Sequence, residues 1–135
     1  MGPLDKFMLP DDALTETADG FDVAIRLHWY RSLPLSSIAN IALKIDGENI
    51  APEKMSFELN GKVHQMNELE NLYKEWWFIL DRAILHVHQN KKIKGGKQHE
   101  VELEFGLLLP YILVGPNLLP MLSSGKITKQ LISIN

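Results

Sequence analysis

Cysteine is absent from this chain of 135 residues, which excludes disulfide bridges and thiolate metal sites. No apolar run approaches the roughly 18 residues of a membrane-spanning helix, and the first residues lack the apolar stretch of a signal peptide. Positive charge is not in excess either, because 14 Lys and Arg stand against 17 Asp and Glu, for a net charge of −3. We therefore expect a cytoplasmic protein that binds neither nucleic acid nor membrane.

Recognisable catalytic motifs are also missing. The sequence has no Gly-x-Ser-x-Gly nucleophile motif, and Gly95-Gly96 leads toward a strand rather than the helix N-terminus that a phosphate cradle needs. What is present is the composition of a globular protein, with 45% hydrophobic and 23% charged residues. The length predicts one domain over residues 1–135.

Alternation of apolar and polar residues is the strongest pattern in the chain. It recurs, as expected for strands with one buried face, in four stretches: 21–29, 41–45, 55–59 and 101–105. Asp46-Gly47 and Asn60-Gly61 are turn signals, and residues 127–134 are apolar and β-branched enough for a closing strand. The pattern predicts an all-β fold, an antiparallel, jelly-roll-like β-sandwich.

Residues 67–78 fit two structures. Asn67 could cap a short helix with apolar residues at spacings of three and four, namely Leu69, Leu72, Tyr73 and Trp76. The aromatic run over residues 76–78 instead favours a strand. On a strand, at least one of Trp76 and Trp77 should face outward, because adjacent side chains diverge.

His86 and His88 are expected on the same face of one strand, about 7 Å apart. That spacing could supply two ligands to zinc or a similar ion, with a third from another strand. Because Leu85 and Val87 occupy the opposite face, a pair of solvent-facing histidines on the polar side is the simpler interpretation.

The order of several short motifs resembles the small β subunit of the bacterial C-glycoside deglycosidases. Residues 30–36, Tyr-Arg-Ser-Leu-Pro-Leu-Ser, are similar to a Tyr-Arg-Gly-x-Pro-Leu-Ser step of that family, with Ser32 in place of glycine. A strand ending in Ile45-Asp46-Gly47 follows, where the family has Val-Asp-Gly. The similarity reaches about Tyr111 and includes further stretches: 4–8, 57–61, Leu69 with a later Trp, and 99–103.

The resemblance implies a subunit of a heteromeric lyase of carbohydrate metabolism that acts on C-glycosides, flavonoid glycosides among them. Its partner would be a catalytic TIM-barrel α subunit that holds a divalent metal, expected to be Mn²⁺. The complex would cleave the carbon–carbon bond between the aglycone and a 3-oxo sugar by β-elimination. Because base and ligands belong to the α subunit, no catalytic residue is expected in this chain.

Partner contacts are expected from aromatic and basic residues near the strand break at Pro34. We predict that the interface includes Tyr30, Arg31, Leu35, Trp76 and Trp77, since such residues are common interface anchors. The alternative for residues 30–35 is that they form a corner of the sandwich and pack within this chain instead of contacting a partner.

Two other functions stay open. One is a stand-alone sugar-binding β-sandwich in which Trp76 or Trp77 stacks on a pyranose. The other is a small metalloenzyme that uses His86 and His88.

Overall fold

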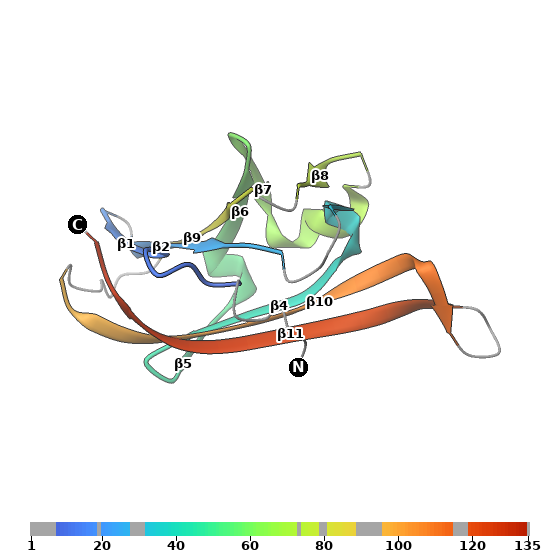
Figure 1. Cartoon of the computed structure of the whole chain (residues 1–135). Helices are drawn as coiled ribbons and strands as arrows, with labels where there is room; N and C mark the ends of the chain where they lie inside the picture. Colours follow the sequence, from blue (N-terminus) through green and yellow to red (C-terminus); the bar gives the residue numbers. More distant parts are fainter. Residues whose placement is uncertain are drawn as a thin grey trace.

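The computed structural model shows two antiparallel β-sheets, one above the other, with a small third sheet at one end (Figure 1). It describes residues 8–18, 20–27, 32–72, 74–78, 81–88, 96–114 and 119–134. Over these residues the structure consists of strands and short 3-10 turns, which confirms the predicted all-β sandwich. No helix within the described ranges is long and apolar enough to cross a membrane.

The upper sheet has five strands in the order β1-β2-β9-β6-β7, and every neighbouring pair is antiparallel. Its strands are β1 Leu14–Thr17, β2 Gly20–Ile25, β6 Met55–Leu59, β7 Lys62–Gln65 and β9 Ala83–His88. The central strand is β9, where Leu85 pairs with Val23 on one side and with Phe57 on the other. Strands distant in sequence therefore lie side by side.

The lower sheet has four strands in the order β11-β10-β4-β5. Its strands are β4 Ile38–Ile45, β5 Glu48–Ile50, β10 Gln98–Val114 and β11 Leu119–Ile132. The predicted closing strand at 127–134 is thus the second half of a longer one, which ends two residues earlier.

Both turns predicted from sequence are present. Asp46 and Gly47 join β4 to β5 with φ angles of 49° and 83°, and Asn60 and Gly61 join β6 to β7 with 53° and 82°. Two successive positive φ angles match the twist of flanking strands, which is why Asp-Gly and Asn-Gly suit these positions.

The core lies between the two sheets and follows the predicted alternation. Phe21, Val23 and Ile25 of β2 are fully buried, as are Leu103 and Phe105 of β10. Burial of each large apolar side chain contributes about 1.5–3 kcal/mol to folding. The alternation that predicted the strands thus also identified which face is buried.

Residues 66–78 combine parts of both expected structures. A 3-10 turn, η4, spans Met66–Asn71 and is followed by a two-residue strand, β8, at Trp76–Trp77. The cap is Gln65 rather than Asn67, because the backbone N–H of Gln65 donates to the Glu68 carboxylate at 2.8 Å. Tyr73 lies outside the described residues.

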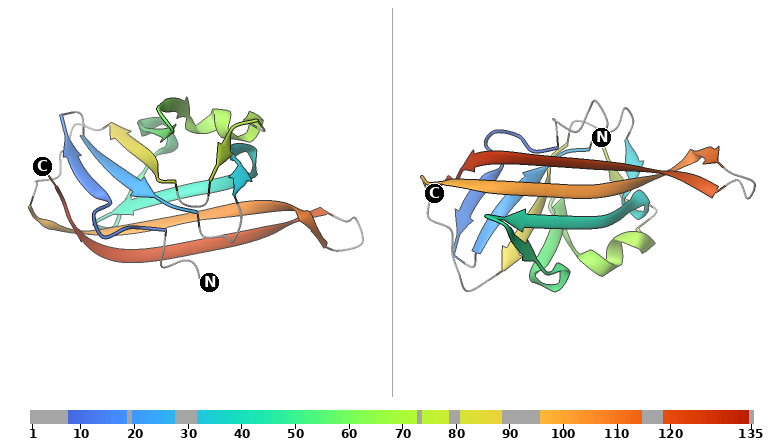
Figure 2. Two further views of the ribbon diagram at one scale, coloured as in Figure 1. Left: turned by 45° about the horizontal axis from the view of Figure 1, so that its top comes forward. Right: turned by 90° about the horizontal axis from the view of Figure 1, so that it is seen from below.

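The hairpin of β10 and β11 extends well past the rest of the fold (Figure 2). β10 pairs with β4 only from Val101 to Leu107, and beyond that point its pairs in the described residues, at 108–109 and 113–114, are with β11 alone. The register shifts between Leu109 and Leu113. We call the strand segments 108–114 and 119–122 the arm.

Candidate functional site

The region that the sequence predicted as an interface lies at one end of the sandwich. There β3 (Leu33–Pro34) pairs with β8 in a two-stranded sheet, and the 3-10 turn η2 (Leu35–Ser37) follows directly. The backbone N–H of Leu35 donates to the Glu75 carbonyl at 2.8 Å, which fastens η2 to the residue before β8.

Trp77 is the central side chain of this end and is fully buried. Its ring meets Phe57 of the upper sheet edge-to-face at 5.5 Å and stacks on Phe105 of the lower sheet at 5.9 Å. The indole N–H donates to the Asp81 carbonyl at 2.9 Å. Trp77 therefore links both sheets, and the aromatic pairs add about 0.5–1.5 kcal/mol each beyond area burial.

The five residues predicted at the interface fall into three groups. Leu35 and Trp77 are fully buried within this chain, so their side chains offer no surface to a partner. Tyr30 and Arg31 lie outside the described residues, so their contacts stay a prediction. Trp76 is 46% exposed, which confirms that at least one of the two adjacent tryptophans faces outward.

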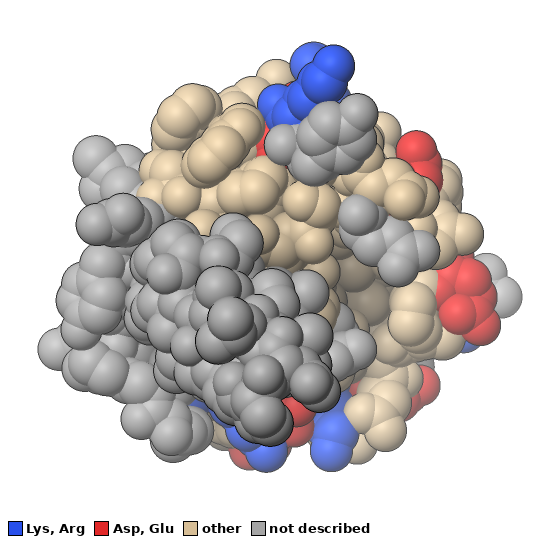
Figure 3. Space-filling model, turned by 90° about the vertical axis from the view of Figure 1, so that its right-hand side faces the viewer, with Lys and Arg blue, Asp and Glu red and all other residues tan. Residues whose placement is uncertain are grey.

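Trp76 is accompanied by a second exposed aromatic ring. Phe78, two residues further, is 55% exposed, while Trp77 between them points into the core. Seen from this end, charged residues lie mainly toward the rim and uncharged residues fill the upper centre (Figure 3). Exposed aromatic rings are typical of protein interfaces.

His86 lies on the outer face of the upper sheet between two carboxylates. Its Nδ1 is 2.7 Å from Oδ1 of Asp22, and its Nε2 is 2.8 Å from Oε1 of Glu58. Partial burial, the largest single influence, disfavours the charged ring, but the two hydrogen bonds and the carboxylate charges outweigh it and raise the pKa of His86. The ring therefore links β9 to β2 and β6, and the raised pKa favours its protonated form.

The metal hypothesis for His86 and His88 loses its geometric support. Both ring nitrogens of His86 already face carboxylates, while His88 is exposed at the end of β9. Within the described part of the chain, no three His, Asp or Glu residues gather as metal ligands. Both histidines lie on the polar face of β9, as expected, but only His88 is exposed, whereas His86 is partly covered by carboxylates from β2 and β6.

A second histidine–carboxylate contact closes the β4–β5 turn. The Nδ1 of His99 is 2.8 Å from Oδ2 of Asp46, and Oδ1 of Asp46 accepts the backbone N–H of Glu100 at 2.9 Å. The Nε2 of His99 is buried and has no hydrogen-bond partner among the described residues. This contact fastens the turn to β10.

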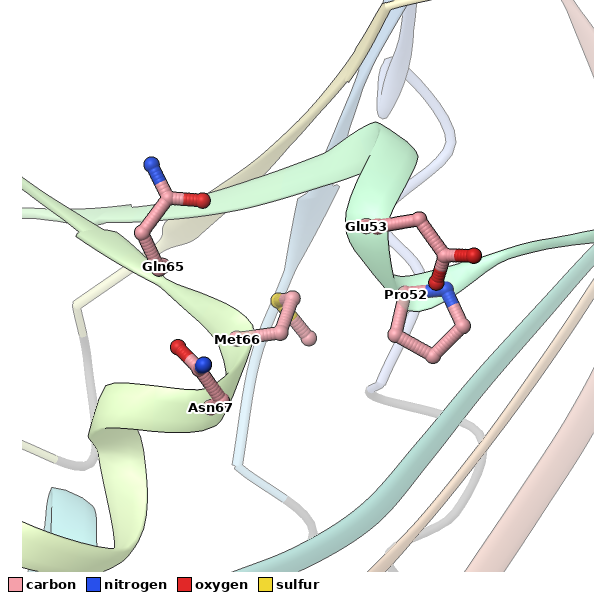
Figure 4. Close-up of a pocket in the computed structure, with 5 residues that line it drawn as sticks. All are labelled: Pro52, Glu53, Gln65, Met66 and Asn67. Atoms are coloured by element: carbon pink, nitrogen blue, oxygen red, sulfur yellow. The ribbon is translucent and has the colours of Figure 1, made fainter.

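A small pocket of about 240 Å³ lies between η4 and a further 3-10 turn, η3 (Pro52–Lys54) (Figure 4). Met66 reaches from one wall toward Pro52 on the other, and the side chains of Gln65, Asn67 and Glu53 complete the lining. None of the five lining residues carries an aromatic ring on which a pyranose could stack. The pocket therefore gives the sugar-binding alternative little support.

Comparison with known proteins decides the family. A model of the family described as C-glycoside deglycosidase beta subunit matches residues 5–111. The chain belongs to this family.

Individual relatives align with most of the chain. A C-glycoside deglycosidase beta subunit from Microbacterium trichothecenolyticum is 38% identical, covering 79% of this chain and 84% of that protein. One from Arthrobacter globiformis is 28% identical, covering 81% and 83%. A 3'-dehydrocarminate deglycosidase beta subunit from a Microbacterium species is 29% identical, covering 84% and 85%. The resemblance inferred from short motifs is thereby confirmed.

Proposed function

We propose that this chain is the non-catalytic β subunit of a metal-dependent C-glycoside deglycosidase. The family match over residues 5–111 carries the proposal. The names of the relatives support it, since each is called the beta subunit of a deglycosidase. The exposed Trp76 and Phe78 provide a surface that such a partner could cover.

The proposed reaction is a β-elimination on a sugar whose C3 is already a ketone. The ketone acidifies the C–H bond at C2, so that a base can remove this proton. A double bond then forms between C1 and C2, the bond from C1 to the aglycone breaks, and the aglycone carbon takes up a proton. The complex would therefore be a lyase.

The residues that perform this chemistry are assigned to a TIM-barrel α subunit. A divalent metal held there, proposed as Mn²⁺, would polarise oxygens of the sugar. In this chain, Trp77 and Leu35 hold the β3–β8 end in shape by their burial. Trp76 contacts the partner, and Tyr30 and Arg31 are proposed to do the same.

The decisive experiment is reconstitution. The chain is co-expressed with a sugar-isomerase-like barrel encoded in the same genome and purified through a tag on one subunit. Cleavage of a 3-oxo C-glucoside is then measured for the complex and for each chain alone, with and without EDTA. We expect activity only in the complex, lost with EDTA and restored by Mn²⁺. Cleavage by this chain alone would contradict the proposal.

The exposed ring of Trp76 also favours a second candidate, a stand-alone sugar-binding module. Titration of tryptophan fluorescence with simple sugars and with flavonoid C-glucosides separates the two. Saturable binding by the isolated chain that Trp76→Ala abolishes would favour the sugar-binding module. A flat titration favours the subunit.

A further inference from the structure

In the described part of the chain, no strand of the two sheets other than β10 and β11 pairs with the arm. The last residue of β10 that pairs with β4 is Leu107, which lies opposite Ile38. Beyond it, the only pairs in the described residues join β10 to β11, two before and two after the register shift over residues 110–112. Figure 1 and Figure 2 both show this ribbon projecting past the two sheets. Seven residues at no more than about 3.3 Å each give it a length of at most roughly 20 Å, because the register shift shortens the strand.

Charged residues are confined to the part of the β10–β11 hairpin that lies over the core. The part of β10 that lies over the core carries His99, Glu100, Glu102 and Glu104, and the matching part of β11 carries Lys126 and Lys129. Between them, residues 105–125 contain no Asp, Glu, Lys, Arg or His. The composition of the arm is that of a buried segment.

A ribbon of this kind is not expected to persist alone in water. An isolated two-stranded hairpin is marginally stable at best, because it has no second layer to bury its apolar side chains. Projecting sheet edges are normally protected by charged residues, whereas here proline at positions 110, 116 and 120 is the only common edge-protecting residue. From its composition and its pairing, the arm is expected to be covered by another surface.

We propose that the arm inserts into an apolar groove of the α subunit and is the main attachment of this chain to its partner. The inference rests on the proposed function, because the relatives are named as subunits. The arm also projects from the same end of the sandwich that carries β8, with the exposed Trp76 (Figure 1). A single partner surface could therefore contact both features.

The register between β10 and β11 shows where the arm can be deleted. Leu107 and Ser123 lie directly opposite each other, so a two-residue Asn-Gly turn can replace residues 108–122 without disturbing the remaining pairs. A milder variant combines Leu113→Glu with Val114→Glu, which places one charge on each face of the strand.

The matched control is Ile132→Glu, which also puts an acidic residue into this hairpin, but at its opposite end. Ile132 is 60% exposed, so the substitution should leave the fold unchanged. Circular dichroism and thermal unfolding of each isolated variant establish that the sandwich is intact before binding is measured.

We expect the shortened chain to fold and its affinity for the α subunit to fall by roughly 100-fold or more, as for the loss of several buried anchors. The double Glu variant should lose nearly as much, while Ile132→Glu should bind like the natural chain. Amide hydrogens of residues 108–122 should become protected from exchange only in the complex.

The outcomes separate the two proposals. If the natural chain forms no complex with the barrel subunit, the proposed function fails, and this inference fails with it. If the natural and the shortened chain bind equally well, only the role of the arm is overturned. If the natural chain alone forms a dimer that the shortened chain does not, the arm binds a second copy instead, which also overturns the inference.

Discussion

At the scale of single residues, Trp76 and Trp77 are neighbours with opposite environments. Trp77 contacts both sheets, so Trp77→Ala should lower the free energy of unfolding by about 3–5 kcal/mol. Trp76→Ala, at a half-exposed position, should change it by less than about 1 kcal/mol. Denaturant unfolding of both variants measures the contrast, and equal losses would show that the burial pattern of β8 is wrong.

Binding to the partner should depend on Trp76, the exposed member of the pair. Trp76→Ala should weaken the complex with the α subunit by about tenfold or more, since tryptophan is the residue most often found at energetic centres of interfaces. Ile134→Ala is the control, because Ile134 is exposed to the same extent as Trp76, 46%, but pairs with Thr15 of β1, at the edge of the upper sheet opposite β7. Isothermal titration measures both, and indistinguishable affinities would remove Trp76 from the interface.

His86 makes stability depend on pH. Its pKa is raised above 6.5 in the folded state by hydrogen bonds and charge from Glu58 and Asp22, which together exceed the effect of burial. The imidazolium bridge is therefore fully present below the ordinary pKa and is lost as pH rises through the raised folded-state value.

Replacement of His86 tests this bridge. His86→Gln should reduce the free energy of unfolding by about 1.5–3 kcal/mol near pH 5.5, the usual range for hydrogen bonds to charged groups. The difference from the natural chain should shrink as pH rises through the raised folded-state pKa of His86. Unfolding in urea at a series of pH values is the measurement, and a difference that grows with pH would reverse the sign proposed here.

At the scale of elements, the two tight turns depend on glycine. Gly47 and Gly61 have φ of 83° and 82°, and a Cβ added at either position would touch nothing within 4 Å. The cost of Gly47→Ala or Gly61→Ala is therefore backbone strain alone, about 1 kcal/mol each. Thermal unfolding should show similar shifts for both, and a much larger loss at either would indicate a packing role.

The sequence predicted those elements whose physical cause is local. Alternation within 21–25 and 101–105 identified strands and their buried faces, and two-residue turn signals placed the hairpins. Each of these depends on neighbours along the chain. The fold class followed from them.

Elements set by tertiary contacts were not predictable in the same way. The continuation of β10 to Val114 and of β11 back to Leu119 contains prolines, which normally argue against a strand. It forms because each segment pairs with the other, with a register shift that accommodates the sequence.

In the site, the carboxylates beside His86 were missed because they come from strands far away in sequence. One signal was available in the sequence: Asp22, Glu58 and His86 each alternate with the apolar residues of their strands, so all three are expected on the outer face of a sheet.

At the scale of the whole molecule, the arm should limit how well this chain behaves without a partner. Expressed alone, the natural chain should aggregate more readily than the shortened chain, since the arm is an uncharged sheet edge. Soluble yield and light scattering of the two chains measure this. Equal solubility would indicate that the arm is already covered in the isolated protein.

The position of β9 determines the order in which this protein can fold. β9 lies between β2 and β6, although it follows both in the chain and pairs residues as distant as Phe21 and Val87. The upper sheet therefore cannot close during synthesis until residues 83–88 have left the ribosome. Until then the facing edges of β2 and β6 stay open, whereas the β10–β11 hairpin can form from adjacent sequence. Insertion of β9 should be the slow step, on the millisecond-to-second scale typical of non-local β-pairing.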